Sequence, residues 1–405
     1  MSRFSLPLVL ACGSGIAMIS LGERSAFGLF QTDIVAAREW GRETFAFAFA
    51  LQNLLWGIGQ PIAGALADRY GTLRVLAAGG VMYAAALAGT VYMESAVAVT
   101  IMFGVLLGLA MSACSFTLVI SAFGRIVSPA QRSLAFGVGT AAGSLGMFLF
   151  GPLAAVLLNS VGWETGLLVF ASIALLVVVF AIPLQGKPVP DTTGPQQSLG
   201  AALSEALSYR SYVLLVFGFF VCGFHVAFII AHMPSYLIDL GMGPAIGGTA
   251  IALIGLFNVI GSLAAGAIGQ RYSKSYSLAV LYFLRSVAIL VFVMVPVTGM
   301  SVIVFSSVMG LLWLSTVPLT SGLVAVMFGP RYMATLFGVV FLSHQVGSFL
   351  GVWLGGLIYA ETGSYDLLWY IGIALGLFAA VVHIPIRDAP GPRLSAASAT
   401  AAAAA

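Results

Sequence analysis

Six ionisable side chains stand inside stretches of this sequence that are otherwise apolar. They are Glu23, Arg24, His225, His232, Arg285 and His344. A charged group at the centre of a bilayer costs about 2.5–3.5 kcal/mol on insertion scales, so such residues usually serve a site that needs them. Arginine can give two parallel hydrogen bonds to a carboxylate, and histidine exchanges protons near neutral pH. These residue types indicate a buried anion site with groups that could carry a proton.

Arg24 is the strongest candidate for contact with an anion. It follows Glu23 directly, and consecutive residues on a helix point about 100° apart, so the two cannot share one face. Arg24 instead shares a face with Gly28 and Gln31. We expect Arg24 and Gln31 to line a substrate cavity, and Glu23 to balance the charge or to carry a proton. The alternative is a structural ion pair near the end of the helix, where water is close.

A second polar face lies in residues 211–238. His225, Phe228, His232 and Tyr236 follow one another at steps of three, four and four residues, which places them on one side of a helix. Two imidazoles and a phenol suit hydrogen bonding to an organic anion, and His232 is a second candidate proton carrier. Alternatively, the imidazoles bond to backbone carbonyls or hydroxyls of neighbouring helices.

Other polar side chains recur at helical spacing in the remaining apolar stretches. Interhelical hydrogen bonding is the rival explanation for each of them. We expect further substrate contacts from Trp313, Thr316, Thr320, His344 and Gln345. Supporting roles are expected for Asn53, Ser115 and Arg285, and for Arg285 a structural role is favoured over binding.

The composition requires a membrane protein around these residues. Of the 405 residues, 60% are hydrophobic and 7% are charged, and mean hydropathy is +1.08, whereas soluble domains carry about 25% charged residues. Runs of about 20 apolar residues can each cross a hydrocarbon core about 30 Å thick. We predict an all-α integral membrane protein with twelve spans. They are residues 6–31, 44–67, 74–93, 96–122, 132–158, 165–185, 211–238, 247–269, 275–296, 300–327, 333–359 and 366–386.

Basic residues outside these spans are unevenly distributed between the two sides. Only Arg38 and Arg42 fall on one side. The other side holds Arg3, Arg69, Arg74, Arg125, Arg132, Lys187, Arg210, Arg271, Lys274, Arg331, Arg387 and Arg393. Cytoplasmic loops carry the excess of lysine and arginine, so this distribution places both termini in the cytoplasm. Both termini can lie on the same side only if the number of spans is even, which supports twelve.

The spans divide into two related halves. IGQPIAGALADRYG (Ile58–Gly71) aligns without a gap with IGSLAAGAIGQRYS (Ile260–Ser273), and such duplication is typical of secondary transporters. We predict six-helix bundles at residues 1–185 and 211–390, a cytoplasmic linker at 186–210 and a disordered tail at 391–405. After the linker's Pro- and Gly-rich segment, Leu199–Leu207 is either a short surface helix or an ordinary loop turn.

Small residues indicate where helices pack closely. Gly347, Gly351 and Gly355 recur at every fourth residue, and Gly139 and Gly143 do so in the fifth predicted span. Glycine stripes of this kind allow two helices in a bilayer to approach. We therefore predict tight packing along the eleventh and fifth spans.

The segment GALADRYGTLRV (Gly64–Val75) resembles the loop signature of the major facilitator superfamily. The resemblance implies two bundles that alternate in access to a central cavity lined by the first, fourth, seventh and tenth spans. It also implies a cytoplasmic gate. The matching residues are Gly64, Asp68, Arg69, Gly71 and Arg74.

Further stretches resemble a bacterial branch related to monocarboxylate and oxalate transporters. They are GERSAFGLF, FHVAFIIAHMPSYL, WLSTVPLTSG and FLSHQVGSFLGVWLGG. We expect a secondary active transporter of a small organic anion, proton-coupled or working by exchange, in a bacterial inner membrane. An exporter of drugs, metalloids or hydrophobic metabolites is the alternative, and a membrane sensor is less favoured. We expect a monomer that is not an enzyme, with no cofactor, metal or nucleic acid.

Overall fold

A computed structural model describes residues 4–126, 132–186, 198–328 and 333–391, and within these ranges the regular structure is entirely helical. The elements are α1 (Leu6–Ala37), α2 (Arg42–Tyr70), α3 (Thr72–Tyr92), α4 (Ala96–Val99), the π-helix η1 (Thr100–Leu106), α5 (Leu107–Ala113), α6 (Phe116–Ile126), α7 (Arg132–Ala174), α8 (Leu176–Phe180), the 3₁₀ turn η3 (Ile182–Leu184), α9 (Leu199–Ser208), α10 (Arg210–Asp239), α11 (Pro244–Arg271), α12 (Lys274–Met294), α13 (Gly299–Leu312), α14 (Thr316–Phe328), α15 (Met333–Thr362) and α16 (Asp366–His383).

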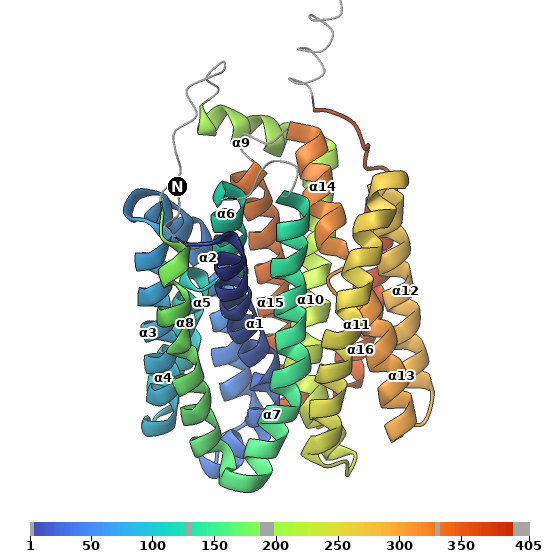
Figure 1. Ribbon diagram of the computed structural model, residues 1–405. Helices are drawn as coiled ribbons and strands as arrows, with labels where there is room; N and C mark the ends of the chain where they lie inside the picture. Colours follow the sequence, from blue (N-terminus) through green and yellow to red (C-terminus); the bar gives the residue numbers. More distant parts are fainter. Residues whose placement is uncertain (1–3, 127–131, 187–197, 329–332, 392–405) are drawn as a thin grey trace, which may run out of the picture.

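Ten stretches among the described residues are long and apolar enough to cross a membrane. One of them, Val138–Phe180, folds back at Gly162, whose φ of 78° interrupts the helix, so it holds two crossings. Helix α2 is not among the ten, yet it runs alongside the others (Figure 1). These two features reconcile the ten apolar stretches with the twelve predicted spans.

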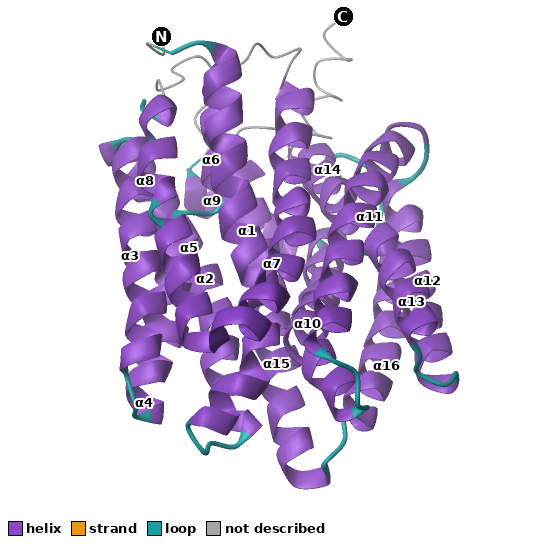
Figure 2. Cartoon of the chain, turned by 60° about the horizontal axis from the view of Figure 1, so that its bottom comes forward, coloured by secondary structure: helices purple, strands orange, loops and turns teal. Residues whose placement is uncertain are grey.

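The helices form two bundles that lie side by side (Figures 1 and 2). We call α1–α8 the N-terminal bundle and α10–α16 the C-terminal bundle. They meet mainly along three helix pairs, α1 with α10, α2 with α15, and α7 with α11, and α1 also touches α11. In the duplicated halves α2 corresponds to α11, and the first part of α7 to α15. The second and third pairs are therefore exchanged by the internal symmetry.

The predicted fourth and tenth spans are both broken. The fourth leaves helical geometry at Cys114, between α5 and α6, and the tenth does so at Trp313, between α13 and α14. The two breaks occupy matching places in the duplicated halves. Broken helices free backbone groups in the middle of a membrane protein, and they typically occur where the chain borders a cavity.

The glycine stripes pack as predicted in the described residues. A Cβ atom at Gly347 or Gly351 would collide with the backbone of Phe220 or Phe224 on α10, and one at Gly355 would collide with the His232 ring. In the N-terminal bundle, Gly143 fits against Leu21 of α1. Both bundles thus owe their closest helix contacts to residues without side chains.

Local sequence rules set several helix ends. Thr298 and Ser301 form a reciprocal capping box at the start of α13, and Ser273 caps α12 by accepting from the amide of Tyr276. Gly71, with φ 95°, makes the turn from α2 to α3.

Helix α9 is present, so the short helix is the correct alternative after the linker. The linker residues 187–197 and the tail residues 392–405 lie outside the described ranges.

The interface is closed toward the end where α1 finishes and α2 begins, here termed the closed end. There a Cβ at Gly28 would strike Ile230, one at Gly151 would strike Gly248, and one at Gly356 would strike Ala46. At the other end, termed the open end, no atom of the described residues lies within 4 Å of such a Cβ at the symmetry-related Gly64 or Gly266. Within the described ranges, the close glycine contacts between the bundles thus lie toward the closed end.

Candidate functional site

A cavity of about 760 Å³, its open mouth included, lies between the two bundles. Its lining comes from both broken spans and from α1, α2, α7, α10 and α15 of the interface. The residues are Leu21, Arg24, Ser25, Trp56, Phe116, Thr140, Ser144, Met147, Phe219, Val226, Ile230, Trp313, Leu314, Val317, Phe337, Phe341 and His344. Arg24 and His344 are the ionisable members of this lining, and no carboxylate of the described residues belongs to it.

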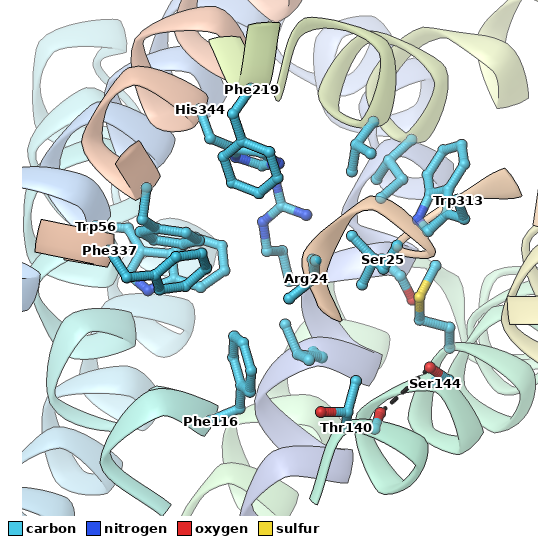
Figure 3. Close-up of a pocket in the computed structure, with 17 residues that line it drawn as sticks. Arg24, Ser25, Trp56, Phe116, Thr140, Ser144, Phe219, Trp313, Phe337 and His344 are labelled. Atoms are coloured by element: carbon cyan, nitrogen blue, oxygen red, sulfur yellow. Dashed lines mark hydrogen bonds between the residues drawn. The ribbon is translucent and has the colours of Figure 1, made fainter. Parts of the chain in front are cut away.

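Arg24 projects into the centre of this cavity, with Trp56 on one side and Trp313 on the other (Figure 3). The side chain is 4% exposed. Its Nη2 donates to the Asn53 side-chain oxygen, and its guanidinium lies 5.2 Å from the centre of the Trp56 ring. Its Nε has no hydrogen-bond partner within the described part of the chain. A buried cation held only by an amide and a ring retains donors for an anionic ligand.

A row of ring contacts leads from Arg24 across the bundle interface. Trp56 of α2 meets Phe341 of α15 edge-on with ring centres 5.4 Å apart. Phe341 stacks on His344 at 5.5 Å and 7°, and His344 in turn contacts Phe219 of α10 at 5.0 Å. The Trp56–Phe341 contact is the step that joins the two bundles, so the cavity wall contains an aromatic bridge between them.

Ser115 supports this wall indirectly. The Trp56 indole donates to the Gln60 side-chain oxygen at 3.1 Å, and the Gln60 amide donates to the Ser115 hydroxyl at 2.7 Å. Because Ser115 lies at the break in the fourth span, this chain of bonds ties the orientation of Trp56 to that break. Ser115 itself is not part of the cavity lining.

Arg285 secures the break in the tenth span. It is fully buried on α12, and it donates from Nε and Nη2 to the Leu312 carbonyl at 3.1 and 2.7 Å. Nη2 also donates to the Trp313 carbonyl. These carbonyls end α13, where the helix dipole leaves partial negative charge. Arg285 thus acts as a charged C-terminal cap that places Trp313 in the cavity wall, as the expected structural role requires.

Asn258 of α11 holds the same break from the other side. Its side-chain oxygen accepts from the Leu314 amide at 2.9 Å, and its amide nitrogen donates to the Ser144 hydroxyl of α7 at 3.0 Å. Ser144 belongs to the N-terminal bundle. One side chain therefore links the broken helix, the cavity wall and the opposite bundle.

The two histidines of α10 are placed within the C-terminal bundle. His225 Nε2 lies 2.7 Å from the Gly372 carbonyl of α16, and His232 Nε2 lies 2.7 Å from the Val352 carbonyl of α15. A carbonyl oxygen can only accept a hydrogen bond, so the Nε2 atom of each histidine carries a hydrogen. Neither residue lines the cavity. The arrangement corresponds to the alternative of bonding to neighbouring backbone.

His344 lines the cavity. Its Nδ1 lies 3.0 Å from the Gln345 side-chain oxygen, which also accepts from Ser348 at 3.3 Å. Gln345 is fully buried and lies behind His344 rather than in the lining. It orients the imidazole whose stacked face borders the cavity.

The remaining expected contact residues lie outside the lining. Gln31 and Thr320 are fully buried, and their side-chain polar atoms find no partner among the described residues. Thr316 is 3.2 Å from the Cys222 sulfur. Tyr236 packs against Trp369, with ring centres 5.7 Å apart. They could reach a ligand only after the helices move.

Glu23 is fully buried inside the N-terminal bundle. Neither oxygen of the Glu23 carboxyl group has a hydrogen-bond partner within the described ranges. The ionisable groups that face it are Tyr83 of α3 and Cys114 at the break in the fourth span, besides the adjacent Arg24. Glu23 is therefore not the ion-pair partner of Arg24 in this conformation.

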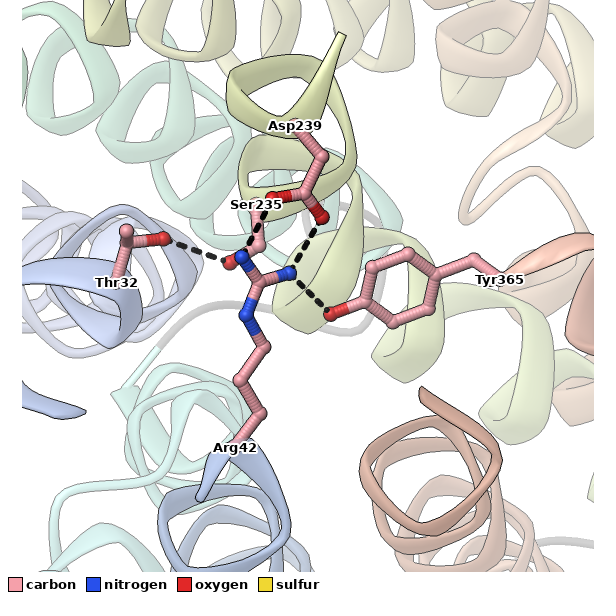
Figure 4. A network of polar contacts seen from close by, with 5 residues as sticks. All are labelled: Thr32, Arg42, Ser235, Asp239 and Tyr365. Carbon is pink, nitrogen blue, oxygen red and sulfur yellow. Dashed lines mark hydrogen bonds and ion pairs between the residues drawn. The ribbon is translucent and has the colours of Figure 1, made fainter. Parts of the chain in front are cut away.

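The closed end carries a polar lock between the bundles (Figure 4). Arg42 of α2 donates to both oxygens of Asp239 on α10 at 2.6 Å and to the Tyr365 hydroxyl at 3.1 Å. Burial raises the pKa of Tyr365 to about 12, so this phenol stays neutral at physiological pH. Beside this lock, the hydroxyls of Thr32 and Ser235 join α1 to α10 at 3.2 Å.

The expected gate residues lie toward the open end. Gly64 faces open space, Gly71 forms its turn, and Arg74 is exposed. The side chains of Asp68 and Arg69 are outside what the structure describes. Their expected latch therefore stays a prediction.

Several of the lining residues that were missed from the sequence are aromatic. Phe116, Phe219, Phe337 and Phe341 line the cavity, but phenylalanine is common throughout apolar spans and its type alone marks no site. The signal that could have identified Phe341 is its spacing of three residues from His344, which places both on one helical face.

Comparison with known proteins places this cavity in a family context. A family model described as Major Facilitator Superfamily matches residues 12–352. The uncharacterized MFS-type transporter YcxA of Bacillus subtilis is 26% identical over 376 residues, covering 90% of this chain and 91% of the relative. Monocarboxylate transporter 11 of Mus musculus is 22% identical over 398 residues, covering 94% and 87%.

Solved structures share the architecture. A bacterial homolog of the human lysosomal transporter Spinster, in an inward-facing and occupied conformation, superposes with a TM-score of 0.75 at 13% identity over 97% of this chain and all of that one. A D-xylose–proton symporter gives a TM-score of 0.69 at 14% identity over 94% and 98%. At these identities the likeness establishes the fold alone.

Proposed function

Because the chain belongs to the major facilitator superfamily, we propose that the solute it transports is a small organic anion, in particular a carboxylate. The observation that carries this proposal is Arg24, a buried guanidinium in the cavity between the bundles with no acidic partner among the described residues. Attraction between a cation and an anion strengthens where water is scarce. A carboxylate at Arg24 would use donors that Asn53 and Trp56 leave free.

The two ends of the interface support alternating access. The lock of Arg42, Asp239 and Tyr365 holds the closed end, while Gly64 and Gly266 leave room for closure of the open end. Rocking of the bundles would break the lock at the closed end and bring the bundles together near Gly64 and Gly266 at the open end. By the distribution of basic residues, the open end faces the cytoplasm of a bacterial inner membrane, with both termini on that side.

Coupling to protons would use Glu23. Burying a carboxylate charge without a partner is costly, so a proton on Glu23 stabilises the present arrangement, and its release requires a conformation that admits water or brings Arg24 closer. His232 is the weaker candidate because its ring is held by the Val352 carbonyl. Exchange of one anion for another needs no such group.

Proteoliposome flux tests the proposal. Vesicles containing the purified chain should take up radiolabelled carboxylates from a mixed panel of mono- and dicarboxylates, and Arg24→Gln should abolish uptake while leaving the elution profile of the protein unchanged. Arg24→Lys should keep part of the activity, since lysine retains the charge but not the two-point geometry. Uptake by Arg24→Gln equal to that of the unaltered chain would refute an anion site at this residue.

The aromatic lining favours a second candidate, export of amphipathic cations or hydrophobic metabolites. Cations can stack on the faces of tryptophan and phenylalanine rings, and six such rings border this cavity. The same vesicles separate the two functions. Movement of amphipathic cations that survives Arg24→Ala, together with no competition from any carboxylate, would establish the second function in place of the first.

A further inference from the structure

Arg24 is the one lysine or arginine among the described residues that line the cavity, and it supplies a fixed cation there. The other intramembrane guanidinium, that of Arg285, already donates hydrogen bonds to the carbonyls of Leu312 and Trp313. A ligand with a single carboxylate leaves no charge unmatched here, whereas a second carboxylate would enter an apolar wall without a fixed counter-charge.

The rest of the wall is built for a flat apolar body. Rings of Trp56, Phe116, Phe219, Trp313, Phe337 and Phe341 border the space. The hydroxyls of Ser25 and Ser144 are already engaged, donating to the Gly22 carbonyl and accepting from Asn258. Aromatic walls favour offset or edge-on contacts with another ring, worth about 0.5–1.5 kcal/mol per pair beyond simple burial.

The position of the charge relative to the rings narrows the ligand further. The guanidinium lies against Trp56, and Trp56 meets Phe341 across the bundle interface. A carboxylate at Arg24 therefore projects its remaining atoms along rings from both bundles. A two-carbon acid would engage Arg24 and leave most of these rings facing water, while an arylacetate would cover them.

We propose that the preferred substrate is a monocarboxylate with an aromatic or similarly flat apolar body, bound by its carboxylate at Arg24 and by its ring against Trp56, Phe341 and their neighbours. This inference rests on the proposed function, because it specifies the anion that the same site takes. It also explains why the aromatic bridge crosses the interface: the ligand's ring contacts both bundles at once, so its binding bears on the movement between them.

Four probes at graded concentrations test it by thermal shift of the purified chain: phenylacetate, its uncharged counterpart phenylacetamide, acetate and oxalate. A ligand that binds the folded state raises its unfolding temperature by mass action. We expect half-maximal stabilisation by phenylacetate at a concentration at least tenfold below that for acetate or oxalate, and no shift with phenylacetamide. Arg24→Gln should lose the phenylacetate shift.

Ring removal provides the matched variants. Phe341→Leu keeps an apolar side chain but deletes the ring, and should weaken phenylacetate about three- to tenfold, as loss of a ring pair predicts, with acetate unchanged. Phe283→Leu is the control, because Phe283 is 50% exposed on α12 and does not belong to the lining. Equal effects of the two substitutions would overturn the assignment of the ring site.

The outcomes separate this inference from the proposed function. Acetate or oxalate binding as tightly as phenylacetate, in an Arg24-dependent way, would refute the aromatic preference and leave the anion transporter standing. No response to any carboxylate, or equal responses to phenylacetate and phenylacetamide, would refute both.

Discussion

Arg42 and Asp239 form a two-point ion pair that joins the two bundles, with each nitrogen–oxygen distance 2.6 Å. Arg42 extends from the first turn of α2, and Asp239 is the last residue of α10. The Arg42 guanidinium also lies 4.1 Å from the Tyr359 ring centre. The side chains are 12% and 29% exposed, so solvent screens the pair and its contribution is modest. The pair shifts the equilibrium of this end toward the closed arrangement but does not hold it closed by itself.

Loss of this pair should open the closed end more often. In a chain whose native cysteines are replaced, Asp239→Asn should raise the labelling rate of Ser235→Cys about two- to fivefold, as expected for a partly exposed ion pair. Ser235 is fully buried beside the pair. Arg42→Asp combined with Asp239→Arg should return the rate toward its original value. Unchanged labelling in Asp239→Asn would show that other contacts hold this end.

Closure of the open end should depend on the two unobstructed glycines. A Cβ at Gly64 or Gly266 meets no atom of the described residues in this conformation, so Gly64→Val and Gly266→Val should both fold and bind substrate normally. They should fail to transport, because the added side chains occupy space that the bundles need when this end closes. Paired binding and flux measurements decide it. Normal flux would mean that α2 and α11 do not approach at these positions.

Arg285 should matter for the shape of the cavity rather than for its charge. Arg285→Met leaves the Leu312 and Trp313 carbonyls without donors, which costs about 1–3 kcal/mol for a buried group, and should lower the unfolding temperature. Arg285→Lys should recover part of the loss. Tryptophan fluorescence quenching by the substrate should weaken in both, since Trp313 loses its fixed position. A Met variant as stable as the parent would exclude the capping role.

Glu23 should separate coupling from transport. Glu23→Gln keeps the shape of the side chain but cannot release a proton, so accumulation driven by a pH gradient should disappear while exchange of internal for external anion continues. Proteoliposomes measure both with one preparation. Loss of exchange together with accumulation would assign Glu23 a structural role, and retention of both would place the coupling group elsewhere.

The sequence predicted the spans, the duplication and the exceptional status of Arg24, because each depends on patterns within one helix. Apolar length identifies a crossing, and a lone guanidinium in a crossing requires a reason. The surroundings of His225 and His232 could not be predicted in the same way. Their spacing showed that they share a face, but every helix of a bundle has more than one buried face, and packing decides which one borders the cavity.

Arg285 illustrates the other limit. Its position in the middle of an apolar span was evident, yet its partners are backbone carbonyls freed by a break in another helix. The sequence marked that region through Trp313, Thr316 and Thr320 as expected contacts, and nothing in it showed that the helix breaks at Trp313. The aromatic lining was equally hidden, since phenylalanine fills lipid-facing, core and cavity positions alike.

The most direct test of an anion site at Arg24 is a map of the chain bound to a carboxylate that carries a heavy atom on its ring, such as 4-bromophenylacetate. We expect the carboxylate within hydrogen-bond distance of the Arg24 guanidinium and the bromine signal among the rings of the cavity between the bundles. A bromine signal elsewhere in the protein, or a carboxylate turned away from Arg24, would contradict it.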